Sequence, residues 1–176
     1  MIKYQLILDI AGVIITNISP LFWNELAESA FVSSENLKTQ FKQEIRKLLW
    51  TGKISEEDFW EWISKQCPLI EIHNAQTILV KHLKRLPAFN YVPNWSQVAD
   101  IHLLSNHRID SSIGYCKPDP ESYEIVKSRL KTDLQVIFVD DQEKNMKPAK
   151  DLLWNTLIAD KNGNWIKRLE NILYKN

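Results

Sequence analysis

Short apolar segments that alternate with helical sequence patterns constrain the fold of this chain most. The four apolar segments are 4–10, 101–104, 136–140 and 156–159. Helical patterns lie at 120–131, 144–154 and 164–174. The first apolar segment reads YQLILDI, without the polar alternation of a strand that faces water on one side. Strands of this kind that alternate with helices predict an α/β fold, with a parallel sheet of about four strands covered on both faces.

One long stretch, residues 17–87, does not follow this alternation. Its pattern is helical with breaks at 31–34, 51–52 and 67–68. We therefore predict about four helices, one of which starts at the capping box formed by Ser55 and Asp58. No Gly/Ser-rich linker divides the chain. The prediction is a core of residues 1–16 and 88–176, with a helical cap of residues 17–87 inserted after the first strand.

The charge balance argues against highly charged partners. The 176 residues include 22 Lys and Arg against 22 Asp and Glu, so no strong field attracts nucleic acid or anionic lipid. The apolar run 6–15 is too short to span a bilayer, and we expect a cytoplasmic protein without membrane or nucleic-acid partners. Cys67 and Cys116 lack the paired spacing of zinc or redox motifs, which favours reduced structural thiols.

Polar residues stand where the predicted strands end. They are Asp9, Ser105, Asn106, Asp140 and Asp141, and Lys117 lies on a loop just before a helix. Ligand sites of open parallel sheets lie at the carboxyl ends of the strands, so we expect these side chains to converge. Three carboxylates at one place repel each other unless a cation is present, and oxygen ligands favour a hard ion such as Mg²⁺. The same ion would attract a phosphate group.

These residues occur in four motifs that resemble those of the haloacid dehalogenase (HAD) superfamily of hydrolases, in the same order. The motifs are LILDIAGV at 6–13, LLSN at 103–106, KPDP at 117–120 and FVDD at 138–141 with Asn145. The stretch TGKIS at 51–55, with Phe59 and Trp60, is similar to the helical cap of the glucose-1-phosphatase-like branch. The resemblance covers nearly the whole chain and implies a Rossmann-like core.

The resemblance also implies a mechanism and a role for each motif residue. Asp9 would attack the phosphorus atom of a small phosphorylated molecule and form an aspartyl phosphate, which water later hydrolyses. Asp9, the backbone carbonyl of Ala11, Asp140 and Asp141 would hold Mg²⁺, with Asp141 as the favoured direct ligand. Ser105 and Lys117 would hold the phosphoryl oxygens, and Asn106 and Asn145 would position the substrate.

The chain departs from the family pattern at Ala11. Phosphatases of the family carry a second Asp there, which protonates the leaving group and later deprotonates water. Loss of general acid–base catalysis costs roughly 10² to 10⁴ in rate, so the expectation is a slow phosphatase. A catalytically inactive binding or regulatory protein and a haloacid dehalogenase remain alternatives. His107 is a candidate substitute proton donor, because its pKa lies near neutrality.

Two further expectations concern the loop and the cap. Residues 108–116 are too few for the helix and strand that the family usually has there, so the sheet should lose an edge strand and a loop should carry Lys117. Tryptophans at helical spacing in the cap indicate a cap core, or a groove for an apolar partner. The cap makes either a monomer or a homodimer plausible.

Overall fold

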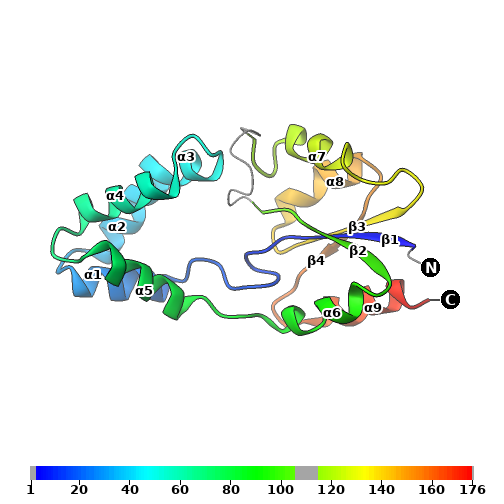
Figure 1. The fold of residues 1–176 in the computed structure, drawn as a ribbon, viewed down its shortest axis with the longest axis horizontal. Helices are drawn as coiled ribbons and strands as arrows, with labels where there is room; N and C mark the ends of the chain where they lie inside the picture. Colours follow the sequence, from blue (N-terminus) through cyan, green and yellow to red (C-terminus); the bar gives the residue numbers. More distant parts are fainter. Residues whose placement is uncertain (1–2, 106–114, 176) are drawn as a thin grey trace. The chain divides into compact units, whose positions relative to one another are not determined.

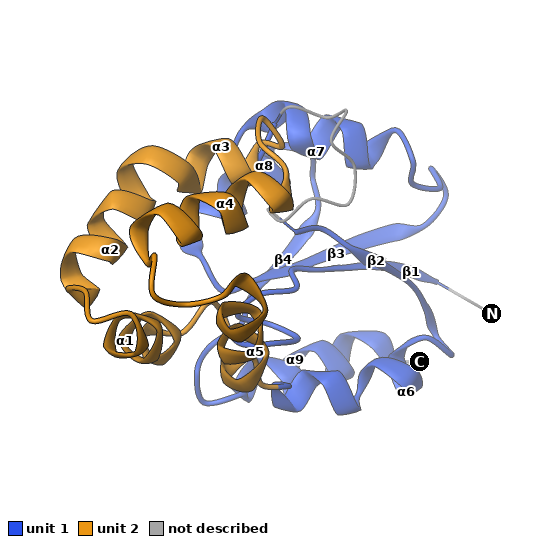
Figure 2. Ribbon diagram, turned by 60° about the vertical axis from the view of Figure 1, so that its left-hand side comes forward, with its two compact units in different colours: residues 1–16, 85–105, 115–176 blue, residues 17–84, 106–114 orange. Residues whose placement is uncertain are grey.

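The computed structural model describes residues 3–105 and 115–175, which form two compact units (Figures 1 and 2). The α/β unit comprises residues 3–16, 85–105 and 115–175, and the helical unit comprises residues 17–84. Residues 85–87, which the sequence analysis assigned to the cap, lie in the α/β unit. They do so because Arg85 bridges to Ile15 and the Leu86 amide donates to the Ile14 carbonyl oxygen at 2.9 Å.

A four-stranded, fully parallel sheet forms the centre of the α/β unit, as predicted. Its strands are β1 (Tyr4–Leu8), β2 (Ala99–Leu103), β3 (Gln135–Asp140) and β4 (Asn155–Ile158). Their order in the sheet is β2-β1-β3-β4. The two central strands, β1 and β3, are the most buried, which explains their unbroken apolar sequences.

Helices lie on both faces of this sheet (Figure 1). The helical segments of the α/β unit are η2 (Pro87–Asn90), α6 (Val92–Trp95), α7 (Pro120–Lys127), η3 (Glu143–Asn145), α8 (Met146–Asp151) and α9 (Asn164–Leu173). One core contains Trp95 and Trp165 with Leu6 of β1. The core on the other face contains Tyr123 and Phe138. Apolar cores thus cover both faces of the sheet, so a ligand site is expected at the carboxyl ends of its strands.

The helical unit, residues 17–84, contains six helical segments where the sequence predicts about four helices. They are α1 (Pro20–Ser29), α2 (Ser34–Gln40), η1 (Phe41–Ile45), α3 (Arg46–Trp50), α4 (Glu56–Gln66) and α5 (Ile72–His82). The number is larger because η1 and α3 continue α2 without a break. The capping box is confirmed: the Ser55 amide donates to Asp58 Oδ2 at 2.6 Å, and the Asp58 amide donates to Ser55 Oγ at 3.1 Å.

A π-helical turn keeps one face of the α2–η1–α3 segment in the core of the helical unit. Leu37, Phe41, Ile45 and Leu49 recur every four residues, and all four belong to or pack against this core. An α-helix has 3.6 residues per turn, so this spacing would drift around it, whereas the wider π turn corrects the drift.

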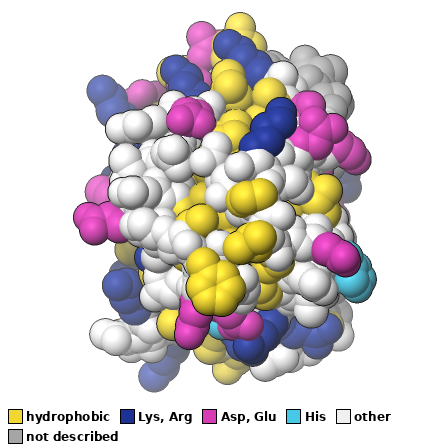
Figure 3. All heavy atoms as spheres, turned by 90° about the vertical axis from the view of Figure 1, so that its left-hand side faces the viewer, with side chains coloured by type: hydrophobic (Ala, Val, Ile, Leu, Met, Phe, Trp, Pro, Cys, Tyr) yellow, Lys and Arg dark blue, Asp and Glu magenta, His cyan; other side chains and the backbone are white. Residues whose placement is uncertain are grey.

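The interior of the helical unit is aromatic, as the sequence indicates. Phe22, Trp23, Phe59, Trp60 and Trp62 are buried in it, and Trp50 is half-buried beneath the Arg46 guanidinium at 5.1 Å from the ring centre. Apolar side chains are also exposed on the face drawn in Figure 3. None of the helices in residues 3–105 and 115–175 is long and apolar enough to cross a membrane.

Candidate active site

Asp9 and Asp140 come together because their strands are neighbours in the sheet. β1 ends at Leu8, and the amide of Asp9 donates to the Val139 carbonyl oxygen of β3 at 2.9 Å. Asp140 is the last residue of β3, and Asp141 follows it. One carboxylate oxygen from each of the three acids lies within 4.8 Å of the other two. The acids predicted to converge are therefore adjacent at the carboxyl edge of the sheet.

Lys117 is buried among these acids, at 3% exposure. Its Nζ lies 2.8 Å from Asp9 Oδ1 and 2.7 Å from Asp140 Oδ2, and it donates to the Leu104 carbonyl oxygen at 2.9 Å. An ammonium group has three N–H donors, so these three contacts use all of them.

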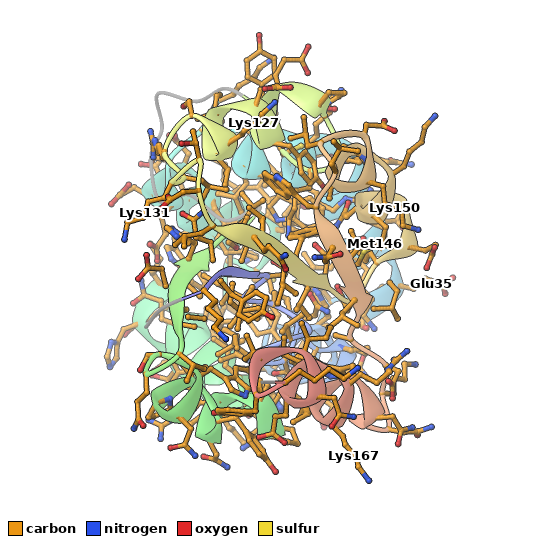
Figure 4. The ribbon with its side chains drawn as sticks, turned by 90° about the vertical axis from the view of Figure 1, so that its right-hand side faces the viewer. Glu35, Lys127, Lys131, Met146, Lys150 and Lys167 are labelled. Carbon is orange, nitrogen blue, oxygen red and sulfur yellow. The ribbon has the colours of Figure 1, made fainter. Side chains whose placement is uncertain are left out.

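Surface lysines of the same unit behave differently from Lys117. Lys127, Lys131, Lys150 and Lys167 extend away from the ribbon in Figure 4. The side chains of Lys127 and Lys131 are 53% and 63% exposed. Burial of an ammonium group is costly unless acceptors surround it, and Asp9 and Asp140 provide them. Lys117 is therefore a fixed charge of the site.

Asp140 is saturated with hydrogen-bond donors. Its Oδ1 accepts from the Gln142 amide at 2.8 Å and from Asn145 Nδ2 at 2.9 Å. Its Oδ2 accepts from Lys117 Nζ at 2.7 Å and from Asn145 Nδ2 at 2.9 Å. A carboxylate offers about four lone-pair positions, so all of them are engaged. Asp140 thus holds Lys117 in place through an existing ion pair.

Asn145 acts on Asp140 and has no surface open to a bound molecule. We predicted it to be a substrate-binding residue, but its side chain is fully buried and its amide nitrogen binds Asp140. The backbone carbonyl oxygen of Asn145 accepts a hydrogen bond from the Tyr123 hydroxyl at 2.8 Å. The difference arises because Asn145, at the end of η3, has its Nδ2 2.9 Å from both carboxylate oxygens of Asp140.

Burial dominates the electrostatics of the site. It is the largest cause of the raised pKa of the Asp9 carboxyl, which lies at about 6. Lys117 and the Ile10 amide lower this pKa, and the negative charge of Asp140 raises it. The pKa of the Tyr123 hydroxyl is also raised, by burial first and then by Asp140 and Asp9. A bound cation would offset the charge of these carboxylates.

The structure describes some of the remaining predicted residues. Ser105 is half-buried and follows β2, and Ala11 is half-buried in the turn after β1. That turn is closed by a hydrogen bond from the Gly12 amide to the Ile15 carbonyl oxygen at 2.7 Å, and Gly12 has φ 95°, which favours glycine. Asn106, His107 and the predicted lysine loop through residue 114 lie outside the described residues.

The donor set fits a hard divalent cation such as Mg²⁺. The three acids supply oxygen ligands within 4.8 Å of one another. Asp140 already accepts four hydrogen bonds, so it would have to give one up to become a direct ligand.

Sequence reasoning missed two contributors to the site. The Leu104 carbonyl oxygen binds Lys117, and Tyr123 holds the backbone of Asn145. A backbone carbonyl leaves no sequence signal. Tyr123 follows the apolar pattern of α7 and looks like any other core residue in the sequence.

Comparisons with known proteins agree with this architecture. No family model matches the chain. The structure of a HAD-family enzyme from Bacteroides thetaiotaomicron matches it with a TM-score of 0.76 at 18% identity, over 100% of both chains. The same enzyme in complex with magnesium and inorganic phosphate matches with a TM-score of 0.77 at 18% identity, over 96% of this chain and 99% of that one.

Two other solved structures are similar. A predicted HAD-like family hydrolase from Porphyromonas gingivalis matches with a TM-score of 0.73 at 18% identity, over 100% of both chains. A dehalogenase matches with a TM-score of 0.63 at 18% identity, over 99% of this chain and 98% of that one. The sheet order, the acidic edge and these similarities together show that the chain has the fold of HAD-family enzymes and hydrolases.

Proposed function

We propose that this protein is a slow magnesium-dependent phosphatase that acts on a small phosphorylated metabolite through an aspartyl phosphate on Asp9. The observation that carries the proposal is the cluster of Asp9, Asp140 and Asp141 within 4.8 Å, with Lys117 buried among them. The magnesium and phosphate bound by the similar enzyme from Bacteroides thetaiotaomicron support it. A cytoplasmic location, as expected from the sequence, remains part of the proposal.

Each residue has a definite task in this proposal. Asp9 supplies the attacking oxygen, and its burial removes the water that would otherwise solvate that oxygen. Lys117 places a fixed positive charge 2.8 Å from Asp9, where negative charge accumulates as the phosphoryl group transfers. Asp140 and Asn145 position Lys117, and Ser105 is expected to bind a phosphoryl oxygen.

Magnesium, when bound, would neutralise charge between the carboxylates and the incoming phosphoryl group. We expect Asp9 and Asp141 to hold it directly, together with the backbone carbonyl of Ala11. Asp140 takes part in the electrostatics of the site through its contact with Lys117.

The test is Mg²⁺-dependent hydrolysis of p-nitrophenyl phosphate by the full chain and by three variants. Asp9→Asn removes the nucleophile and should abolish turnover. Ala11→Asp restores a proton donor and should raise turnover by about 10² or more. Ala11→Asn is the matched control, because it adds similar bulk without a titratable group. Absence of hydrolysis in both the parent and Ala11→Asp would reject the phosphatase proposal for this substrate.

A second candidate function is binding without catalysis, and the methyl group of Ala11 favours it. In that case Mg²⁺ and inorganic phosphate should bind to the parent in calorimetry, while hydrolysis appears only in Ala11→Asp. The dehalogenase alternative predicts halide release from a 2-haloacid without metal. The cluster of three carboxylates within 4.8 Å argues against that alternative, because such a cluster is better explained by a cation.

A further inference from the structure

The charged side chains of Lys117 and Asp140, next to Asp9, already use all their hydrogen-bonding positions. All three N–H donors of Lys117 are used, by Asp9, Asp140 and the Leu104 carbonyl oxygen. All four acceptor positions of Asp140 are engaged as well. Lys117 would have to break an ion pair to deliver a proton, so it serves as a charge and is a poor proton donor.

The segment that follows Asp9 supplies no proton donor either. Residues 10–16 read IAGVIIT and contain no titratable side chain. Within the described residues, the site therefore offers a departing alkoxide no proton from this side. A leaving group that departs as a stable anion has no need of one.

We propose that the substrates of this site are acyl phosphates, and that the phosphoryl group they deliver remains on Asp9 as an accumulating phosphoenzyme. This inference rests on the proposed function, because it requires Asp9 to be the nucleophile. It adds the class of phosphoryl donor and the fate of the phosphoryl group.

The transfer step balances without an added proton. An Asp9 carboxylate oxygen forms a bond to phosphorus while the bond from phosphorus to the acyl oxygen breaks. The electron pair of the broken bond leaves with the acyl oxygen, which departs as a carboxylate. Donor and product are both mixed anhydrides of a carboxylic and a phosphoric acid, so their energies are similar and the phosphoenzyme can accumulate. An alkyl phosphate is not an anhydride, so its phosphoryl group is transferred to Asp9 less favourably. Its leaving group would also depart as a strongly basic alkoxide.

The second step is the slow one. Water must attack phosphorus, the bond from phosphorus to Asp9 must break, and a water proton must be released as inorganic phosphate forms. That proton needs an acceptor, and residues 10–16 provide none. General base catalysis contributes about 10² to 10⁴ in rate, so its loss should make hydrolysis the rate-limiting step.

The experiment incubates the full chain with Mg²⁺ and acetyl phosphate, stops the reaction in acid and measures the intact mass. We expect a mass increase of one phosphoryl group per chain, absent from Asp9→Asn. Ala11→Asp should lower the labelled fraction about tenfold or more by speeding hydrolysis, while Ala11→Asn should retain the label. If Ala11→Asp does not fold, the label in the parent and its loss in Asp9→Asn decide the matter.

Steady-state assays separate this inference from the proposed function. Mg²⁺-dependent hydrolysis of p-nitrophenyl phosphate without any label from acetyl phosphate would overturn the inference alone. Absence of both the hydrolysis and the label would overturn the proposed function as well as this inference. Hydrolysis of glycerol phosphate at a rate near that of p-nitrophenyl phosphate would show that a proton donor exists. An increase of the label in His107→Gln would identify His107 as a base and would also overturn the inference.

Discussion

Asp9 lies in surroundings that disfavour its own charge. Burial, with the charge of Asp140, raises the pKa of its carboxyl from 3.8 to about 6. The carboxyl of Asp9 therefore binds a proton more readily in the folded protein than in the unfolded chain. Stability from this group is present below about pH 4 and is lost as the pH rises through about 6. The residue that we propose as the nucleophile thus weakens the metal-free fold near neutral pH.

Asp9→Asn should therefore gain stability relative to the parent as the pH rises. Without Mg²⁺, its free energy of unfolding should exceed that of the parent at about pH 8 by more than at about pH 5, because Asn cannot ionise. Urea denaturation at both pH values measures the difference. Asp133→Asn is the control, since Asp133 is exposed. A constant difference between Asp9→Asn and the parent would contradict the raised pKa.

Tyr123 supports the site from beneath through one hydroxyl group. Tyr123→Phe removes the 2.8 Å hydrogen bond to the Asn145 carbonyl oxygen and keeps the ring in its core. The free energy of unfolding should fall by about 1 kcal/mol, the usual net value of a buried hydrogen bond. The matched control, Tyr91→Phe, alters a ring that is 36% exposed and should change little. Equal effects in the two variants would show that the hydroxyl of Tyr123 carries no support.

Two helices end in a left-handed residue that is not glycine. Phe31 follows α1 with φ 56°, and Leu153 follows α8 with φ 62°. In both turns the next amide reaches back to the helix, from Val32 to the Ala27 carbonyl oxygen at 2.9 Å and from Trp154 to that of Ala149 at 3.1 Å. Glycine is favoured at such positions. Phe31 and Leu153 are also 87% and 93% exposed, so little packing offsets the strain.

Phe31→Gly and Leu153→Gly should each raise the free energy of unfolding by about 1 kcal/mol. Leu21→Gly is the contrasting variant, because Leu21 is 60% exposed and lies in the first turn of α1, where glycine should lower the free energy of unfolding. Thermal and urea denaturation of the three variants measure the signs. A loss of stability in both left-handed variants would mean that their side chains make contacts that outweigh the backbone strain.

Strand and helix positions followed from the sequence more closely than their ends did. The helical patterns at 120–131 and 144–154 overran the observed α7 and α8. Apolar residues continue beyond both helices, since Leu130 and Leu152 pack against the core from the following turns. Periodicity reports which residues are buried, and the backbone can turn without interrupting that pattern.

The sequence predicted where the candidate site lies, but not which of its side chains bond to one another. Parallel topology alone brings Asp9 and Asp140 to one edge. The engagement of Asp140 by Lys117 and Asn145 depends on side-chain conformations and on the short η3 turn, which the sequence pattern does not encode. The sequence therefore indicated which polar and charged residues meet at this edge. The structure shows which of them form ion pairs and hydrogen bonds with one another.

Each of the two units has a core of its own. The helical unit is built around Trp23, Phe41 and Ile63. The cores of the α/β unit are built around Trp95 on one face of the sheet and Tyr123 on the other. The chain leaves the α/β unit after residue 16 and returns at residue 85. The antiparallel bridge between Ile15 and Arg85 brings these two ends side by side. The helical unit is thus an insertion whose ends are already joined within the α/β unit.

Replacement of residues 17–84 by a short Gly/Ser linker should therefore leave a folded α/β unit. Asp9, Lys117, Asp140 and Asp141 all belong to that unit, so calorimetry should still detect Mg²⁺ binding. In the full chain, Ile63→Ala should weaken the helical core by about 2–5 kcal/mol and leave Mg²⁺ affinity unchanged. Circular dichroism reports whether the shortened chain folds. A folded α/β unit that fails to bind Mg²⁺ would show that the helical unit is needed to complete the metal site.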